Sequence, residues 1–323
     1  MEKREFEIEA LTPLFCHGED KSVVEMRATS IKGLLRYWWR IMKINENENE
    51  TFDLKDENEI FGSTEKRSTF KLQIIPGNGI RNIEIMENIK QNPGLKYAWM
   101  NGPVYRDKNR DKTKDKNRDG DQYRTMIYPA RYKIIFNFYD KVNEDILKSF
   151  YYLIKYGGIG GKNRRGAGKF IFLNNGLNYT KKYNRLKLLE CNLKFDSWQK
   201  AINFLGSVYW IYRAKNKHRD DKYYLGSPKF REKDRIPSKV IFEIFKNNDK
   251  YQTGYLLLYD EEDKNFSEQL DIFKNYLLDK LYSQYLNDVI RNNKKDFLRK
   301  TYDKLKNYIA QLGNFSFTEV TDE

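Results

Sequence analysis

The spacing of apolar residues along the chain predicts strands and helices in alternation. Within Lys3–Ala10 charged and apolar residues alternate, with Phe6 and Ile8 on one face, and this period of two is typical of a strand. Within Ser30–Lys43 the apolar residues recur at helical spacing, and Ser30 is a suitable N-cap. The N-terminal part is therefore expected to be a strand followed by an amphipathic helix.

The same reading predicts one order of elements twice. In the first half, strands are expected at 3–10, 70–75, 131–138 and 169–173, and helices at 30–43 and 144–156. In the second half, strands are expected at 186–195, 254–260 and 315–320, with helices from the cap Asp196 or Ser197 to about Arg213 and over 266–311. Segments 223–230 and 239–245 are expected to form a hairpin around the turn 235–237. Each half approximates strand, helix, two strands, helix, strand, which is the ferredoxin-like pattern.

The predicted fold is α+β, with two ferredoxin-like (RRM-like) domains in tandem and a helical C-terminal part. A length of 323 residues suits two domains, expected at 1–182 and 183–323. The acidic, asparagine-rich segment Asn45–Asn58 is expected to be a mobile surface excursion. The segment Tyr105–Arg124 holds eight cations and five aspartates, and we expect it to be a disordered loop.

The excess of positive charge in the chain indicates which class of partner it binds. Lysine and arginine number 60 against 46 acids, and from Ile146 to Leu189 there are ten cations and no acid. Such asymmetry indicates a nucleic acid or an anionic membrane. No apolar run approaches a spanning length and the N-terminus is charged, so neither a membrane nor a signal peptide is expected. With two cysteines, Cys16 and Cys191, the expected location is the reducing cytoplasm.

The helix at 30–43 carries a line of cations beside its apolar face. Lys32, Arg36, Arg40 and Lys43 stand at i, i+4, i+8 and i+11, so they share a stripe of the helix. A row of cations on a rigid helix suits a polyanion backbone. A solvated helix face is the alternative for this stripe.

A glycine-rich segment, Gly157–Lys169, lies between a predicted helix and a predicted strand. Glycine permits positive φ and close approach, so Gly160 and Gly161 are expected to admit RNA, with the interleaved cations contacting phosphates. The segment is not a Walker A loop, because Ala167 stands where the lysine must be, and Asn163 breaks the dinucleotide fingerprint. A purely structural turn is the alternative.

The sequence offers little catalytic or metal chemistry. Its two histidines, His17 and His218, have no recognisable ligand spacing with the cysteines, so no metal and no cofactor are expected. An EF-hand-like start at 115–121 fails because Met126 occupies the twelfth position. His17 could serve a metal-free ribonuclease as general acid, although a loop histidine with ordinary hydrogen bonds is the plainer interpretation.

Several motifs resemble one known family. These are Leu11–Phe15, then Glu25–Arg40 with its Trp38-Trp39-Arg40, the block Ile60–Ser63, the glycine-rich segment, and Leu225–Phe230 with Ile236–Ser238. Together they resemble the CRISPR RAMP superfamily, and most of all its Cmr-one subunits of type III-B Cmr effectors. The resemblance implies two RAMP domains in a complex containing guide RNA, target RNA and other Cmr subunits.

That resemblance implies a subunit that binds RNA near the 3′ end of the guide, in antiviral defence, and does not cut it. An alternative is a metal-independent, Cas6-type endoribonuclease on the same fold, using His17. No catalytic residue is assigned. The expected RNA-binding residues are Arg27, Lys32, Arg36, Arg40, Gly160, Gly161, Lys162, Asn163, Arg164, Arg165, Lys169, Lys229 and Arg231.

Overall fold

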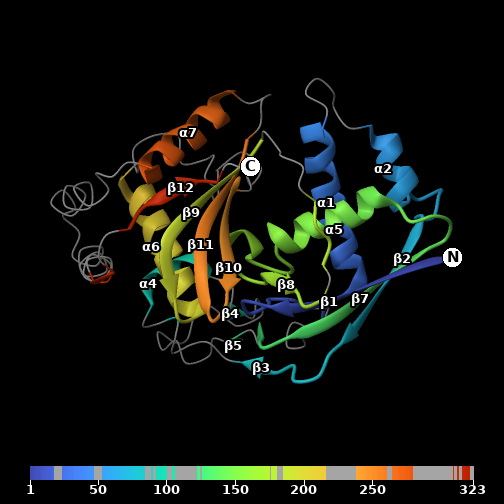
Figure 1. The fold of residues 1–323 in the computed structure, drawn as a ribbon, viewed down its shortest axis with the longest axis horizontal. Coiled ribbons are helices and arrows are strands. Elements are labelled where there is room, and N and C mark those ends of the chain that lie inside the picture. The colour runs from blue at the N-terminus through green and yellow to red at the C-terminus, as the bar shows by residue number, and fades with distance from the viewer. Residues whose placement is uncertain are drawn as a thin grey trace, which may run out of the picture. The chain divides into compact units, whose positions relative to one another are not determined.

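A computed structural model gives the fold of the chain (Figure 1). The residues it describes are 1–17, 24–46, 53–83, 89, 92–99, 104–105, 122–123, 126–174, 176–179, 185–215, 238–259, 264–278, 308, 311–312 and 315–320. They form α+β structure with antiparallel sheets. No helix among them is long and apolar enough to cross a membrane.

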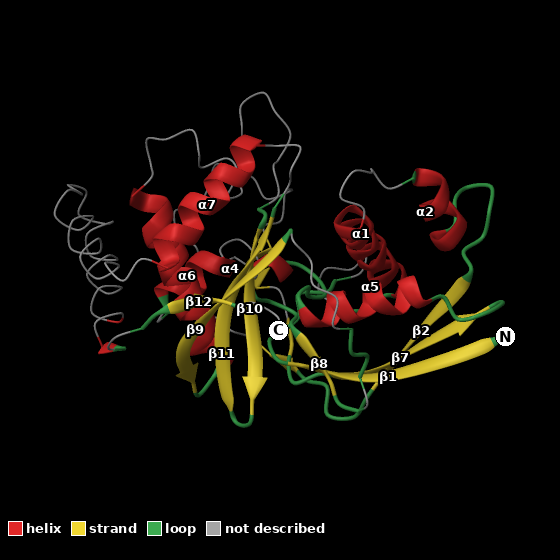
Figure 2. Ribbon diagram, turned by 45° about the horizontal axis from the view of Figure 1, so that its top comes forward, coloured by secondary structure: helices red, strands yellow, loops and turns green. Residues whose placement is uncertain are grey.

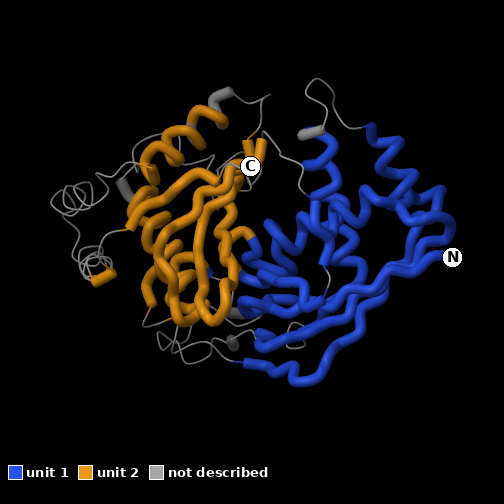
Figure 3. Tube along the Cα trace, in the orientation of Figure 1, with its two compact units in different colours: residues 1–86, 99–163, 167–179 blue, residues 87–98, 164–166, 180–323 orange. Residues whose placement is uncertain are grey.

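The chain divides into two compact units (Figure 3). Unit 1 comprises 1–86, 99–163 and 167–179, and unit 2 comprises 87–98, 164–166 and 180–323. Two short segments of the first half therefore belong to unit 2. The predicted boundary at 182/183 lies outside the described residues.

Unit 1 contains a four-stranded antiparallel sheet of order β2-β7-β1-β8, covered on one face by α1 and α5 (Figure 2). Its core includes Phe6 and Phe136, whose rings pack against Phe150 of α5 at centroid distances of 5.4 and 5.1 Å. The elements are β1 (Glu2–Ala10), α1 (Ala28–Glu46), α2 (Leu54–Phe61), β2 (Phe70–Pro76), β7 (Arg131–Phe138), α5 (Glu144–Lys155), a 3₁₀ turn at its border with unit 2 (Asn163–Arg165) and β8 (Phe170–Phe172). Two short pairs join β3 (Asn82–Ile83) to β6 (Met126–Ile127) and β4 (Val104–Tyr105) to β5 (Gln122–Tyr123).

Unit 2 contains a second four-stranded antiparallel sheet, of order β10-β11-β9-β12. Aromatic contacts hold its helices to the sheet: Tyr209 of α6 lies 5.4 Å from Phe242, and Phe273 of α7 lies 5.4 Å from Tyr255, between ring centroids. The elements are α4 (Pro93–Trp99), β9 (Leu186–Phe195), α6 (Trp198–Lys215), β10 (Val240–Asn247), β11 (Lys250–Leu258), α7 (Lys264–Leu278) and β12 (Phe317–Glu319). Helix α4 belongs to unit 2 up to Ala98, and its last residue, Trp99, belongs to unit 1.

Helix α4 is attached to α6 by contacts within unit 2. The side-chain oxygen of Asn203 accepts from the backbone N–H groups of Gly94 (2.9 Å) and Leu95 (3.3 Å), two donors in the first turn of α4 that have no intrahelical partner. Tyr97 stacks on Trp210 with 5.8 Å between centroids. A Cβ on Gly206 would stand 2.1 Å from the carbonyl oxygen of Gly94, so the two backbones touch.

Most predicted elements are present. Of the helix expected over 266–311 the structure describes α7, which ends at Leu278. The interior of the expected disordered loop, 106–121, lies outside the described residues, whereas Tyr105 and Gln122–Tyr123 at its ends are paired in β4 and β5.

Three further expectations need correction. Helix α1 begins at Ala28, because the carbonyl of Arg27 accepts from the N–H groups of Ser30 and Ile31, so Ser30 lies inside the first turn. The expected excursion Asn45–Asn58 contains most of helix α2, which starts after the N-cap Asp53. Strand β10 forms its hairpin with β11, around residues 248–249, whereas the expected partner 223–230 lies outside the described residues.

Candidate nucleic-acid interface

Helix α1 is fixed in unit 1 by its apolar face, which leaves its cations on the other side. Ile31, Leu35, Trp38 and Trp39 are all buried, and the ring of Trp39 packs against Phe61 of α2 at 6.1 Å between centroids. The backbone positions of the arginines on α1 are therefore set by the core.

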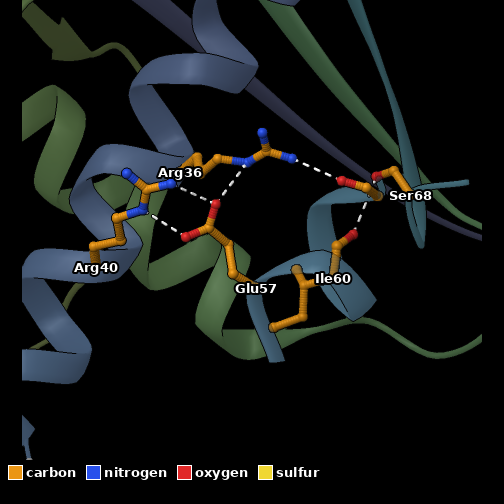
Figure 4. Close-up of polar contacts among 6 residues, drawn as sticks. Arg36, Arg40, Glu57, Ile60 and Ser68 are labelled. Atoms are coloured by element: carbon orange, nitrogen blue, oxygen red, sulfur yellow. Dashed lines mark hydrogen bonds and ion pairs between the residues drawn. The ribbon is translucent and has the colours of Figure 1, made fainter. Parts of the chain in front are cut away.

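Arg36 and Arg40 converge on one carboxylate, that of Glu57 in α2 (Figure 4). Arg40 binds it with two prongs, Nε to Oε2 at 2.5 Å and Nη2 to Oε1 at 2.7 Å. Arg36 Nε lies 3.1 Å from Oε1. The Glu57 side chain is only 3% exposed, whereas those of Arg36 and Arg40 are 35% and 41% exposed. Glu57 raises the pKa of Arg40, chiefly through the hydrogen bonds it accepts.

A second acceptor orients Arg36, because its Nη2 donates to the carbonyl of Gly62 at 2.9 Å. Gly62 ends α2 with φ +83°, and a Cβ there would lie 2.7 Å from the backbone nitrogen of Ser68, so the turn requires glycine. The hydroxyl of Ser68 donates to the carbonyl of Ile60 at 3.2 Å, which closes the same turn (Figure 4). The Ile60–Ser63 block thus fixes an acceptor for Arg36.

The other two cations of the stripe have different surroundings. Lys43 Nζ pairs with Asp145 of α5 at 2.8 Å. Lys32 Nζ lies 5.1 Å from the centroid of the Phe70 ring, and burial, followed by repulsion from Arg36, lowers the pKa of its ammonium. The residues Lys32, Arg36 and Arg40 form what we call the α1 basic face. Arg27, which is exposed, directly precedes the helix.

The glycine-rich segment makes most of its backbone hydrogen bonds within unit 1. The N–H groups of Ile159 and Gly161 donate to the carbonyls of Gly168 and Phe15, both at 2.8 Å, and that of Gly168 donates to Pro13 at 2.9 Å. The Ile159 donor therefore closes the segment on itself, and the donors of Gly161 and Gly168 attach it to the loop after β1, so these three N–H groups are not presented to a ligand.

Only one of the two glycines singled out from the sequence has the expected geometry. Gly160 has φ +93°, and a Cβ on it would lie 2.7 Å from Cys16 Sγ and 2.8 Å from the carbonyl oxygen of Phe15. Gly161 does not have positive φ, and a Cβ there would meet Phe15 at 3.4 Å, an ordinary contact. The close approach at Gly160 is to the protein's own backbone.

Two polar residues of this segment hold it together. Asn163 Nδ2 donates to the carbonyl of Gly158 at 3.1 Å. Lys169 is 1% exposed, and its Nζ donates to the carbonyl of Tyr156, the C-cap of α5, at 3.1 Å. A cation at a helix C-terminus is favourable for the helix. Lys169 is therefore placed to stabilise α5, and this buried position does not suit a phosphate contact.

The two arginines between the glycines belong to unit 2. Arg164 Nη1 donates to the carbonyl of Ser238 at 2.6 Å. Arg165 donates to the Tyr209 hydroxyl at 3.3 Å and the Val240 carbonyl at 3.2 Å, and its guanidinium lies 4.4 Å from the centroid of the Tyr209 ring. Both side chains therefore make hydrogen bonds at the start of β10, and Arg165 also contacts α6. Among the remaining predicted residues, Lys162 is half-buried with φ +59°, while Lys229 and Arg231 lie outside the described residues.

The outer face of the unit 1 sheet does not resemble an RNA-stacking platform. Arg131 of β7 pairs with Glu9 of β1 at 2.9 Å, and Lys133 pairs with Glu5 and Glu7 at 3.4 and 3.9 Å. RNA recognition motifs present aromatic rings on the corresponding surface. The cations of this surface are already paired with three glutamates, which leaves little positive charge there to attract a phosphate backbone.

The described residues contain no group of three or more histidine, cysteine or acidic side chains that could hold a metal ion. Burial raises the pKa of both Cys16 and Cys191 to about 11, so each thiol is neutral at pH 7 and a poor nucleophile. His17 is half-buried, and its backbone forms a bridge with Val24.

Sequence comparisons match about half of the chain, or less, to known proteins. The profile described as "RAMPs: RAMP superfamily" matches residues 7–171. The CRISPR system Cmr subunits Cmr1-1 and Cmr1-2 of Pyrococcus furiosus are 26% identical over 170 residues and 41% identical over 64 residues. These alignments cover 51% and 20% of this chain, and 46% and 34% of the two relatives, so the chain matches less than half the length of each.

Structural comparisons extend the likeness to almost the whole chain. The crystal structure of Cmr1 from Pyrococcus furiosus in its apo form gives a TM-score of 0.56 at 16% identity, covering 99% of this chain and 98% of the other. A chain of the type III-B Cmr-beta complex bound to cognate target RNA and AMPPnP, in the presence of ssDNA, gives 0.51 at 13% identity, covering 83% and 98%. At these identities the likeness is one of fold.

Proposed function

Because the chain belongs to the RAMP superfamily, we propose that both units are ferredoxin-like RAMP domains within an RNA-guided complex. The order of elements and the strand order support this proposal, since β2-β7-β1-β8 and β10-β11-β9-β12 place equivalent strands in equivalent positions. The domains are assigned to residues 1–182 and 183–323, with a helical part near the C-terminus.

The proposed function is that of a non-catalytic, RNA-binding subunit of a type III-B Cmr effector, working in the cytoplasm in antiviral defence. The observation that carries it is the likeness in fold to Cmr1 over nearly the full length of both chains. Its partners are then a CRISPR guide RNA, the target RNA and other Cmr subunits, with contact near the 3′ end of the guide. The Cmr-beta structure, bound to target RNA, supports that choice of partners.

Within the chain, the α1 basic face is the part best suited to phosphates. Arg36 and Arg40 are partly exposed, oriented guanidinium groups, and with Glu57 they retain a net positive charge. Exposed Gly161 and half-buried Lys162 are a second possible contact in the glycine-rich segment. Lys169 and Arg165 are assigned structural roles instead, because their hydrogen bonds lie within the protein.

Binding to single-stranded RNA, followed by fluorescence anisotropy at several salt concentrations, tests this assignment. Wild-type affinity should fall with salt, and Arg36→Ala should weaken binding to all sequences alike and reduce the slope of log K against log salt by about 0.7. Arg4→Ala, which removes an exposed arginine at the start of β1, is the matched control and should change neither quantity. A wild-type slope in Arg36→Ala would remove the α1 basic face from the interface.

Cleavage separates the proposed subunit from a Cas6-type endoribonuclease. The pure protein, incubated with CRISPR repeat RNA in EDTA, should bind without producing a specific cut. Specific cleavage that is lost in His17→Ala would instead establish the endoribonuclease. Purification of the tagged protein from its native cells, with identification of the bound RNA and proteins, tests the assignment to a Cmr complex.

A further inference from the structure

We propose that Glu57 is a positioning residue, which holds Arg36 and Arg40 in the orientation that binds RNA phosphate. This inference rests on the proposed RNA-binding function of the α1 basic face. It gives a role to helix α2, whose acidic residues lie beside the α1 basic face. Attraction between cations and phosphate alone does not explain why acidic residues lie there.

The burial of the three side chains supports positioning. Glu57 is 3% exposed and contacts both guanidinium groups, while each arginine keeps more than a third of its side chain exposed. The buried carboxylate therefore contacts both arginines while part of each arginine side chain stays exposed to solvent. The planar, bidentate pairing of Arg40 restricts the orientation of its guanidinium as well as its location. Arg36 has a single ion-pair contact with Glu57, and the carbonyl of Gly62 supplies its second point of attachment.

The anchoring of α2 shows that the carboxylate itself is held firmly. Phe61, 2% exposed, packs against Trp39 of α1 and against Phe70 of β2, with centroids 6.1 and 5.9 Å away. The carbonyl of Gly62, fixed by its turn, supplies Arg36 with a second acceptor. Long side chains that are already ordered lose less conformational entropy when a ligand binds.

The opposite role for Glu57 would be to mask the arginines until RNA displaces it. Displacement would leave a carboxylate without its partners inside the protein, and a buried charge that loses its partner is strongly destabilising. The observed burial of Glu57 therefore favours positioning over masking.

The two roles predict opposite results for Glu57→Gln, which adds one unit of positive net charge beside the site. Positioning predicts RNA binding weaker by about tenfold, because two arginines must then be ordered on binding. Masking predicts tighter binding with a steeper salt dependence, and that result would overturn the proposal. Glu59→Gln, the same change on an exposed residue of the same helix, is the matched control and should bind like wild type or slightly more tightly.

A double-mutant cycle distinguishes positioning from a general loss of structure. In an Arg36→Ala, Arg40→Ala background, Glu57→Gln should cause no further loss of RNA affinity, since it acts only through the arginines. A further loss of the same size in that background would overturn the proposal. Thermal melting of each variant identifies any that is unfolded.

If Glu57→Gln does not fold, Glu57→Asp provides a second test of the same proposal. It preserves the net charge and shortens the side chain by one methylene, so the carboxylate no longer reaches both arginines. Positioning predicts weakened RNA binding, and an unchanged affinity would contradict it. Failure of wild type to bind RNA would refute the proposed function, whereas normal binding that depends on Arg36 but not on Glu57 would refute only this inference.

Discussion

At the scale of single residues, neighbouring glycines of one loop have different requirements. Gly160→Ala should lower the free energy of unfolding by about 2 kcal/mol, because an L-residue at φ +93° is strained and its Cβ would meet Cys16 and Phe15. Gly161→Ala, where the φ is ordinary and the contact is loose, should stay within about 0.5 kcal/mol of wild type. Urea unfolding of both variants measures this, and equal losses would show that positive φ is not the cause.

The buried thiol of Cys16 predicts a dependence of stability on alkaline pH. Burial, only partly offset by Arg27, raises its pKa from 9.0 to about 11, so the folded state favours the neutral thiol. The stability that the folded state gains from keeping this thiol neutral is therefore complete below pH 9 and is lost as the pH rises through 11. Over two pH units this amounts to about 3 kcal/mol.

Comparison with Cys16→Ala isolates this effect from the titration of other groups. Between pH 8 and pH 11 the wild-type protein should lose about 2 kcal/mol more unfolding free energy than the variant, as measured by urea unfolding. Parallel losses in the two proteins would mean that folding does not raise the pKa of the Cys16 thiol.

At the scale of elements, two helical glycines should respond to alanine with opposite signs. Gly206→Ala should cost about 2 kcal/mol or more, since its Cβ would stand 2.1 Å from the carbonyl oxygen of Gly94 and push α4 from α6. Gly33→Ala should stabilise α1 by about 0.5–1 kcal/mol, because nothing lies within 4 Å of the new Cβ. Thermal melting checks both, and a tolerated Gly206→Ala would contradict the close crossing.

Local patterns predicted those elements whose own periodicity is strong. Strands β7 and β9 have the bounds expected from their alternation, and Ser197 caps α6 through its carbonyl and hydroxyl. The sequence did not predict helix α2, because its acidic sequence has no continuous apolar face. Its buried acid, Glu57, is paired with Arg40, which lies in another helix and is distant in sequence. The cap at Asp53 and the apolar pair Ile60-Phe61 were the available signals.

The candidate interface shows the same division between local and distant information. Spacing alone placed Arg36 and Arg40 on one stripe of α1. It did not reveal that Arg165 and Lys169 are engaged inside the protein, because their partners Tyr209 and Tyr156 are set by the tertiary fold. The cations predicted to bind RNA therefore differ in their surroundings: Arg36 and Arg40 are partly exposed on α1, whereas the side chains of Arg165 and Lys169 make hydrogen bonds within the protein.

At the scale of the whole molecule, unit 2 depends on chain from the first half. A fragment of residues 180–323 lacks 87–98 and 164–166, and with them the contacts of α4 and Arg165 with α6. We expect this fragment to lack cooperative urea unfolding and fixed near-ultraviolet circular dichroism. Joining residues 87–98 to its N-terminus through a flexible linker should restore part of both signals. Cooperative unfolding of the bare fragment would show that these segments are dispensable.

The position of α4 in the chain also has a consequence for synthesis on the ribosome. Its residues emerge about 100 residues before α6, the helix that caps and covers it, and translation at roughly 5–20 residues per second makes this an interval of about 5–20 s. During that interval the N–H groups of Gly94 and Leu95 lack their acceptor Asn203, and Tyr97 lacks Trp210 to stack on. Nascent chains that stall between these two helices should therefore be the ones most dependent on chaperones.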